Sequence, residues 1–272
     1  MDSTRRKADE VRKQAFRLMA DVGGGHYGGN LSEIEILTVL YDGVMNVKPD
    51  CPHWEERDRF IMSKGHGGFG LYAVLSYFGF VDYRKVADKD EFGVMVPKHA
   101  STYVPGVEVS TGSLGQGLSM AVGAALALRA DHPQARVFTM LGDGECNEGQ
   151  VWEAAMAASK YGLDNLIAII DNNHLEFDGP TEEVMPLEPF SGKWASFGWH
   201  TLEVDGHDTQ AIRAALEAAK HLTGKPTVII AHTVKGKGIS YMEHVVTWHA
   251  GTVTEEQYEQ GMRELEAKNG TY

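Results

Sequence analysis

Short apolar runs rich in β-branched residues alternate with longer alanine-rich segments along the second half of the chain, and this alternation limits the folds available to it. Two segments, 148–161 and 209–221, carry a helical pattern, and four runs read as strands: 136–141, 166–170, 199–204 and 226–231. Strands that alternate with helices of about 12 to 15 residues are typical of βαβ units. The sequence therefore predicts an α/β fold with a doubly wound, mostly parallel sheet flanked by helices.

No repeat, low-complexity stretch or proline-rich linker divides the 272 residues, so one domain over 1–272 is expected. Residues 1–22 predict an amphipathic helix with Ala8, Val11, Ala15 and Leu18 on one stripe, and they lack the apolar core of a secretion signal. A loop-rich region is expected at 81–111, and a helix after Thr254. Met140, Met156 and Met185 are expected to fill the core.

The charge balance argues against nucleic acid and against anionic membranes as partners. The chain has 25 basic and 38 acidic residues, a formal net charge of −13. Its longest apolar runs have the length of strands, so no membrane span is expected. Cys51 and Cys146 lie far apart without metal-ligand spacing, which favours a reducing compartment and a cytoplasmic location.

Polar residues follow two of the predicted strands directly. Asp143, in Gly-Asp-Gly, comes two residues after one strand, and Asn172–Asn173 comes after the next. Ligands of open parallel sheets bind beyond the carboxyl ends of the strands, so the two sites can converge. Carboxylate and amide oxygens suit Mg²⁺, with Ca²⁺ or Mn²⁺ as alternatives, and phosphate oxygens would complete the coordination.

The same residues also fit an ordinary pair of turns, because Gly-Asp-Gly is common turn chemistry. Two features favour a ligand instead. Gly142 and Gly144 leave room for backbone to approach a phosphate, and a helix predicted to begin near Asn147 would point free N–H groups in the same direction.

Three longer stretches narrow the interpretation: 63-SKGHGGFGLYAVL-75, 105-PGVEVSTGSLGQGLSMAVGAALA-127 and 142-GDGECNEGQVWEAA-155. Together with Gly-Asp-Gly and the Asn pair about 30 residues later, they resemble the transketolase family. The resemblance runs from about Met19 to His249. Ser113 stands where many relatives have proline. The resemblance implies a thiamine diphosphate-binding fold, namely its diphosphate-binding domain.

The resemblance also assigns roles to individual residues. Asp143 and Asn173 would bind Mg²⁺ through their side chains, and Leu175 through its backbone carbonyl. Glu148 would join an acidic network at a subunit interface. The remaining residues implied to contact the cofactor include the Gly144 N–H at the diphosphate and backbone groups of Gly112 and Leu114 at the aminopyrimidine, together with Gly142, Glu145 and Lys235.

Four histidines match family positions around the diphosphate and the sugar oxygens: His26, His66, His99 and His249. His66 and His249 are also expected to contact the cofactor. Neutral imidazoles suit the transfer of protons to and from sugar hydroxyls near pH 7. The other eight histidines are expected to be structural, although the role of His207, in Val-Asp-Gly-His-Asp, stays open. Asp208 is a candidate cap for the helix that follows it.

The resemblance points to half of an active site. In transketolases, the glutamate that bonds the aminopyrimidine and the arginines that bind sugar phosphates lie on later domains. We therefore expect the N-terminal subunit of a split transketolase, which needs a C-terminal partner subunit. Two copies of each subunit are expected to associate across a two-fold axis as a heterotetramer. The assembled enzyme would transfer a two-carbon ketol unit from a ketose phosphate to an aldose or aldose phosphate. A split enzyme for a sulfo- or branched-sugar phosphate and a non-catalytic cofactor-binding module are the alternatives. Deoxyxylulose phosphate synthase and dihydroxyacetone synthase resemble the chain less.

Overall fold

The fold is built on one parallel sheet of five strands, in the order β1-β2-β3-β5-β4. The computed structural model describes residues 3–87 and 97–269. The strands are β1 (Arg59–Met62), β2 (Val137–Gly142), β3 (Leu166–Asn172), β4 (His200–Asp205) and β5 (Thr227–His232). The register pairs Gly142 with Asp171, and Asn172 with His232, so the carboxyl ends of β2, β3 and β5 lie at one edge.

Side chains of the three central strands alternate between two apolar cores, one on each face of the sheet. Phe138 and Met140 of β2 belong to one core, whereas Val137 and Leu141 belong to the other. Both faces are covered, so β2 and β3 are buried along their whole length and consist mostly of apolar residues.

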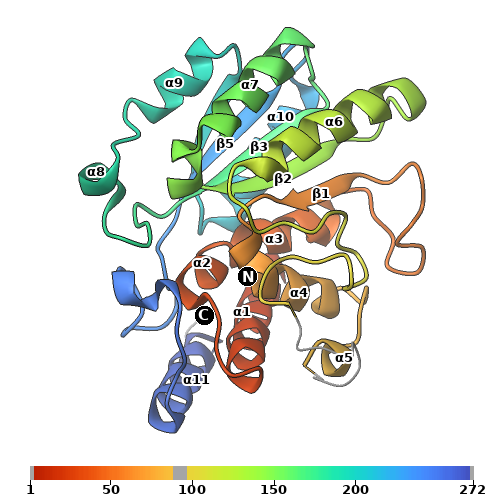
Figure 1. The fold of residues 1–272 in the computed structure, drawn as a ribbon. Helices are drawn as coiled ribbons and strands as arrows, with labels where there is room; N and C mark the ends of the chain where they lie inside the picture. The colour runs from red at the N-terminus through yellow and green to blue at the C-terminus, as the bar shows by residue number, and fades with distance from the viewer. Residues whose placement is uncertain (1–2, 88–96, 270–272) are drawn as a thin grey trace.

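Helices cover both faces, as Figure 1 shows, with α6 and α7 on one side of the sheet and α1 to α4 on the other. The first face carries α6 (Gln116–Asp131), α7 (Gly149–Lys160) and α9 (Phe190–Ser196). The second face carries α1 (Ser3–Asp21), α2 (Tyr27–Ser32), α3 (Ile34–Val39), α4 (Gly68–Tyr77), α10 (Thr209–His221) and α11 (Glu255–Asn269). The remaining short elements are η1 (Leu40–Val44), η2 (Gly65–Gly67), α5 (Tyr83–Ala87), η3 (Gly144–Asn147), α8 (Thr181–Val184) and η4 (Val246–His249).

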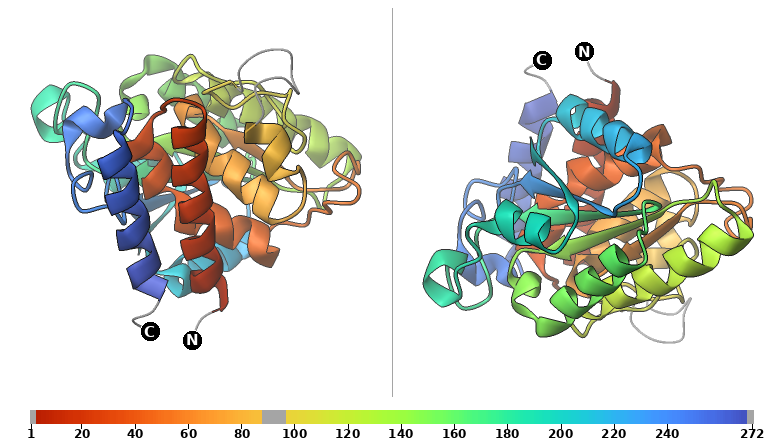
Figure 2. Two further views of the ribbon diagram at one scale, coloured as in Figure 1. Left: turned by 90° about the horizontal axis from the view of Figure 1, so that it is seen from below. Right: turned by 90° about the horizontal axis from the view of Figure 1, so that it is seen from above.

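The first and last helices pack side by side, as both views in Figure 2 show. The ring of Phe16 in α1 stacks on Tyr258 of α11 with centroids 5.6 Å apart. The predicted stripe of α1 is confirmed, because Ala8, Val11, Ala15 and Leu18 are all fully buried. No helix among the described residues is long and apolar enough to cross a membrane.

The predicted α/β class is confirmed, and the strands and helices expected between 136 and 231 lie within two residues of the observed bounds. Asp208 caps α10 by accepting hydrogen bonds from the N–H groups of Gln210 and Ala211. The expected loop-rich segment contains α5, and its residues 88–96 lie outside the described part of the chain. The expectation for the methionines was wrong in two cases: Met140 is buried, but Met156 and Met185 are 54% and 58% exposed.

Candidate functional site

A cavity of about 300 Å³ opens at the carboxyl edge of the sheet. Residues after four different strands reach it: Lys64 after β1, Asp143 after β2, Asn173 after β3 and Lys235 after β5. This is the position at which parallel α/β sheets bind ligands. The sequence-based expectation that Asp143 and Asn173 converge is therefore met by the geometry.

Asp143 is a buried carboxylate held by backbone groups on both sides. Its Oδ1 accepts from the Gly144 N–H at 2.8 Å, and its Oδ2 accepts from the His174 N–H at 2.6 Å. Burial, reinforced by the nearby charge of Asp171, raises the pKa of Asp143 to about 7. A cation bound beside Asp143 would stabilise the ionised form of its carboxylate. The Gly144 N–H, which the family resemblance assigns to a diphosphate, is bonded here to Asp143.

Asp171, at the end of β3, fixes the orientation of Asn173. Its Oδ2 accepts from the Asn173 amide nitrogen at 3.3 Å, and the amide Oδ1 accepts from the Leu175 N–H at 3.2 Å. Asp171 also accepts from the hydroxyls of Ser32 and Thr233. With its nitrogen held by Asp171, Asn173 keeps a lone pair of Oδ1 for a further partner.

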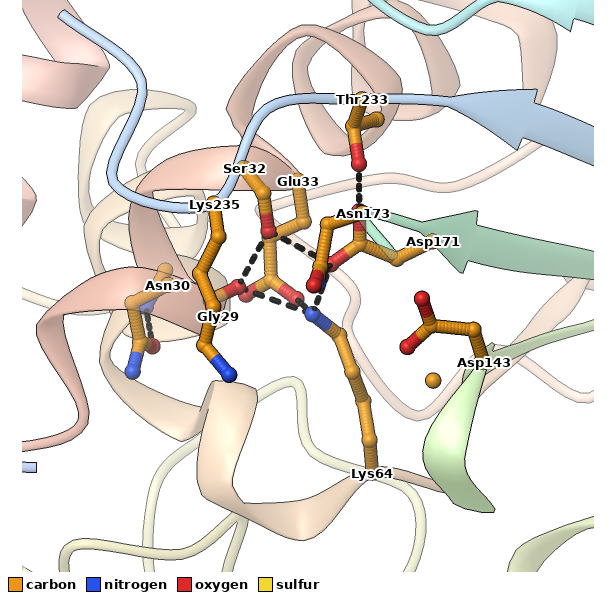
Figure 3. Close-up of polar contacts among 12 residues, drawn as sticks. Gly29, Asn30, Ser32, Glu33, Lys64, Asp143, Asp171, Asn173, Thr233 and Lys235 are labelled. Carbon is orange, nitrogen blue, oxygen red and sulfur yellow. Dashed lines mark hydrogen bonds and ion pairs between the residues drawn. The ribbon is translucent and has the colours of Figure 1, made fainter. Parts of the chain in front are cut away.

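Lys64 neutralises Asp171, and Figure 3 shows the ammonium of Lys64 beside the carboxylates of Asp171 and Glu33. Its Nζ lies 2.6 Å from Asp171 Oδ2, 2.7 Å from Glu33 Oε2 and 2.8 Å from the Gly29 carbonyl oxygen. Burial alone would lower the pKa of Lys64, but the carboxylates of Asp171 and Glu33 raise it. Lys64 therefore donates two hydrogen bonds and forms an ion pair with Glu33, so it acts as an internal counter-charge.

The carboxylate of Glu33 fits because two glycines leave space for it. A Cβ at Gly67 would lie 2.6 Å from Glu33 Oε2, and a Cβ at Gly70 would collide with Oε1. Glu33 is fully buried, which raises its pKa, while the adjacent Lys64 opposes that shift. The Gly-Gly-Phe-Gly segment thus makes room for a charge pair under the site.

Glu145 connects the Gly-Asp-Gly turn to two other loops. Its Oε1 accepts from the Ser63 hydroxyl at 2.5 Å and the Gly115 N–H at 2.9 Å, and its Oε2 accepts from the Gly142 N–H at 3.1 Å. Burial raises its pKa, and these donors oppose the shift. The sequence placed Glu145 among cofactor contacts. It lines the cavity, and the structure adds that it anchors the loops around it.

Lys235 reaches across the cavity from the loop after β5. Its Nζ lies 2.8 Å from the carbonyl oxygen of Leu175, 3.0 Å from that of Glu176 and 2.9 Å from Nδ1 of His249. Burial lowers the pKa of Lys235 to about 8. The carbonyl of Leu175, expected to bind metal, is bonded to this ammonium.

The four predicted histidines form one cluster beside the cavity. His26 lies at its centre, with ring centroids 5.4 Å from His66, 5.4 Å from His99 and 5.7 Å from His249. The ring centroids of His66 and His249 are 5.3 Å apart. The ring of Phe177 packs edge-to-face against His249, with centroids 5.2 Å apart. The Nδ1 atom of His26 is buried without a hydrogen-bond partner among the described residues.

All four rings are held neutral. Burial, then the neighbouring His99 and lysines, lowers the pKa of His26 to about 4. Burial and Lys235 lower that of His249 to about 3, and burial also lowers the pKa of His66 and of His99. Neutral imidazoles can each accept one proton and donate another, which suits them to sugar hydroxyls.

The other predicted residues lie around the same opening. Leu114 and Glu148 line the cavity, and Glu148 is exposed at the N-terminus of α7. Gly112 lies against the ring of His99, since a Cβ there would be 3.6 Å from it.

The residues present fit a diphosphate and a divalent cation by their chemistry. Gly29, Gly142 and Gly144 line the cavity without side chains, and Lys235 adds a positive charge to the lining. Among residues 3–87 and 97–269, no group of three or more His, Cys, Asp or Glu side chains could hold a metal ion. A metal here would therefore depend on one carboxylate, one amide, a backbone carbonyl and phosphate oxygens, which is the mixed oxygen set that Mg²⁺ accepts.

Sequence reasoning missed three buried polar residues of the site: Glu33, Lys64 and Asp171. Lys64 stands two residues before His66, and Asp171 directly precedes the Asn pair, so proximity to recognised motifs was the available signal. His207, whose role the sequence left open, lies outside the cavity. Its Nδ1 is 3.1 Å from Glu35, and its Nε2 is 2.9 Å from the Val234 nitrogen.

Comparison with known proteins places this geometry in a family. Residues 3–269 match the family model described as "Transketolase, thiamine diphosphate binding domain". The 6-deoxy-6-sulfo-D-fructose transketolase subunit SqwG of Clostridium sp. (strain MSTE9) is 44% identical over 96% of this chain and 95% of its own length. One of the apulose-4-phosphate transketolase subunits of Phocaeicola vulgatus is 45% identical over 95% of this chain and 92% of its own.

Among solved structures, transketolase from Leishmania mexicana superposes with a TM-score of 0.90 at 33% identity. The match covers 99% of this chain and 42% of the Leishmania chain, so this chain spans less than half of that relative. The family model, the two subunits of matching length and the shared fold agree with the motifs at the carboxyl edge. The chain belongs to the transketolase family, in which it corresponds to the thiamine diphosphate-binding domain.

Proposed function

We propose that this chain is the diphosphate-binding subunit of a split, thiamine diphosphate-dependent ketol transferase. Asp143, Asn173 and the Leu175 carbonyl would hold Mg²⁺. The glycine-lined wall would hold the diphosphate together with Lys235, whose ammonium would exchange its contact with the Leu175 carbonyl for a phosphate oxygen and keep its contact with His249. When bound, thiamine diphosphate supplies a nucleophilic carbon and an electron sink for cleavage of the ketose C–C bond. The observation that carries the proposal is the cluster of four neutral histidines beside Asp143 and Asn173 at one sheet edge.

The histidines supply the proton handling that ketol transfer requires. A ketose loses a hydroxyl proton when its C–C bond breaks, and the acceptor aldehyde gains one when the new bond forms. The cluster of imidazoles, with a buried unpartnered Nδ1 on His26, suits these exchanges and the orientation of the sugar.

A separate partner chain is proposed to complete the site. The chain corresponds to 42% of the length of the Leishmania transketolase, and the Clostridium and Phocaeicola subunits are of about its own length. We expect the partner to supply the carboxylate that bonds the aminopyrimidine and the groups that bind the sugar phosphate. Two copies of each chain would assemble, with Gly- and Ala-rich α6 and α7 at the two-fold axis.

The substrate is proposed as a ketose phosphate donor with an aldose or aldose phosphate acceptor. A second candidate is a sulfo- or branched-sugar phosphate. It is favoured by the names of the two relatives, which refer to sulfofructose and apulose phosphate. The two candidates share the reacting end of the sugar, where the histidines lie, and differ at the far end.

The test is reconstitution with the candidate C-terminal partner chain. Alone, the chain should show no ketol transfer at saturating thiamine diphosphate and Mg²⁺. Mixed with the partner, it should turn over one of a panel that contains xylulose 5-phosphate, sulfofructose and apulose 4-phosphate. Rapid turnover by the isolated chain would contradict the split site, and an inactive, fully assembled complex across the panel would contradict ketol transfer.

A further inference from the structure

The ammonium of Lys235 has three acceptors, and one of them is a histidine of the cluster. Two are backbone carbonyl oxygens, of Leu175 at 2.8 Å and Glu176 at 3.0 Å, and the third is His249 Nδ1 at 2.9 Å. A carbonyl oxygen only accepts, and an ammonium only donates. Nδ1 of His249 must therefore present its lone pair to Lys235.

A neutral imidazole carries its one proton on the other nitrogen when Nδ1 is an acceptor. The proton of His249 is thus placed on Nε2. No residue among 3–87 and 97–269 forms a hydrogen bond with this Nε2 atom. The rings packed around it belong to His26, His66 and Phe177. The free N–H therefore lies on the side of the ring away from Lys235, available to a ligand.

A second histidine, His207, has the opposite arrangement, with its proton on Nδ1 and its lone pair on Nε2. His207 accepts at Nε2 from the Val234 N–H over 2.9 Å, and its Nδ1 lies 3.1 Å from the Glu35 carboxylate. A carboxylate accepts, so His207 carries its proton on Nδ1. Val234 and Lys235 are adjacent, so one short loop fixes opposite tautomers in two histidines.

The geometry around Lys235 is that of an ammonium. Its Nζ lies within 3.0 Å of two backbone carbonyl oxygens, which can only accept, and of His249 Nδ1. A positive charge this close to Nδ1 disfavours a second proton on the ring of His249.

Resting on the function proposed above, we propose that Lys235 is a positioning residue that fixes His249 as the Nε2–H tautomer. His249 then acts on the sugar as a hydrogen-bond donor and leaves proton abstraction to the other histidines of the cluster. This separates His249 from His26, whose unpartnered Nδ1 is fixed by no neighbour among the described residues.

The first test is independent of catalysis. Two-bond ¹H–¹⁵N correlation spectra of histidine-labelled chain report which ring nitrogen carries the proton, and the His249→Gln and His207→Gln variants assign the signals. We expect Nε2–H for His249 and Nδ1–H for His207, before and after addition of Mg²⁺ and thiamine diphosphate. Protonation of His249 on Nδ1 in either state overturns the proposal.

Lys235→Met then removes the donor with little change in shape. The pKa of His249 should rise by about one unit or more, the usual effect of removing a close positive charge, and its two nitrogen signals should move toward averaged positions. Lys237→Met, in the same loop, should leave His249 unchanged. The ring nitrogen signals of His207, which accepts from the Val234 N–H, show whether the loop after β5 is intact in each variant. An intact loop with an unchanged His249 contradicts the role of Lys235.

The second test uses the assembled enzyme. Glutamine places an N–H near the position of Nε2, whereas asparagine places one near Nδ1. If His249 is a donor, His249→Gln should keep kcat within about tenfold, while His249→Asn and His249→Ala should lose about a hundredfold or more, the scale for loss of one donor. Equal loss in all three variants would mean that His249 is a base. An enzyme with no activity at all would contradict the proposed function, while the spectra would still decide the tautomer.

Discussion

Lys64 Nζ lies 2.6 Å from Oδ2 of Asp171, and both side chains are almost completely buried. This pair connects the loop after β1 to the end of β3 and, through Asp171, to the amide of Asn173. Since Glu33 pairs with the same ammonium, removal of Lys64 would leave two buried carboxylates facing one another.

Lys64→Met should therefore destabilise the isolated chain strongly. Breaking a buried ion pair by removing one partner costs about 3–5 kcal/mol. Denaturation by urea measures the change. Lys237→Met is the control, because Lys237 is 4.0 Å from Glu243 at the surface and should change stability by about 1 kcal/mol at most. Similar losses in the two variants would mean that Lys64 is not the counter-charge of this site.

Gly70→Ala should also be destabilising, because its Cβ would enter the space of the Glu33 carboxylate. Overpacking of this kind costs about 1–3 kcal/mol. Gly123→Ala is the matched control within another helix, where a Cβ meets nothing within 4 Å. That change should stabilise the chain by about 0.4–1 kcal/mol. The Gly70 expectation fails if the two alanine variants unfold at the same denaturant concentration.

Asp143→Ala should remove most Mg²⁺-dependent binding of thiamine diphosphate by the assembled enzyme. Asp143 is the one carboxylate in the proposed ligand set, and calorimetry measures the affinity. Asp178→Ala, a change of another carboxylate that lines the cavity, serves as control and should keep the dependence on Mg²⁺. Unchanged cofactor affinity in Asp143→Ala would refute the metal assignment.

His26→Ala should lower kcat of the assembled enzyme by about two to four orders of magnitude, the range for loss of a general acid–base group. Cofactor affinity should be nearly unchanged, since the expected role of His26 is toward the sugar. Steady-state kinetics and calorimetry on the same preparation separate the two quantities. Full turnover would make His26 a structural residue.

Protonation of His26 in acid should lower the free energy of unfolding of the isolated chain. Its pKa is about 4 in the folded state against an ordinary 6.5, so the unfolded chain binds more protons between these values. The free energy of unfolding therefore falls as pH drops from about 6.5 toward 4. His26→Gln should reduce this fall in thermal melts, and His53→Gln, an exposed histidine outside the cluster, should not. Identical pH profiles for wild type and His26→Gln would contradict it.

The sequence predicted the elements and site residues that depend on local pattern, namely helix and strand periodicity and the polar residues directly after strands. Asp143 and Asn173 could be placed together because strand ends of a parallel sheet meet at one edge. The four-residue strand β1 was too short for periodicity to reveal. Met156 and Met185 were misplaced because residue type alone does not tell which side of a helix or loop faces the core.

The charge pair under the site could not be predicted for a different reason. Glu33 lies in an apolar segment, Leu-Ser-Glu-Ile-Glu-Ile-Leu, where a carboxylate ordinarily marks an exposed face. Its burial depends on Gly67 and Gly70 and on the ammonium of Lys64, all supplied from beyond the next strand. Only the assembled fold brings them together.

The strand order has a consequence for synthesis of the chain on the ribosome. β5 lies between β3 and β4, although it is made after both. β4 therefore waits without a neighbouring strand until residues 227–232 have emerged and inserted beside it. Lys235 and His249 emerge later still, so a nascent chain that already contains Asp143 and Asn173 has neither a closed sheet nor a complete ligand pocket. The cofactor should therefore bind only late in folding, after residues up to His249 have left the ribosome.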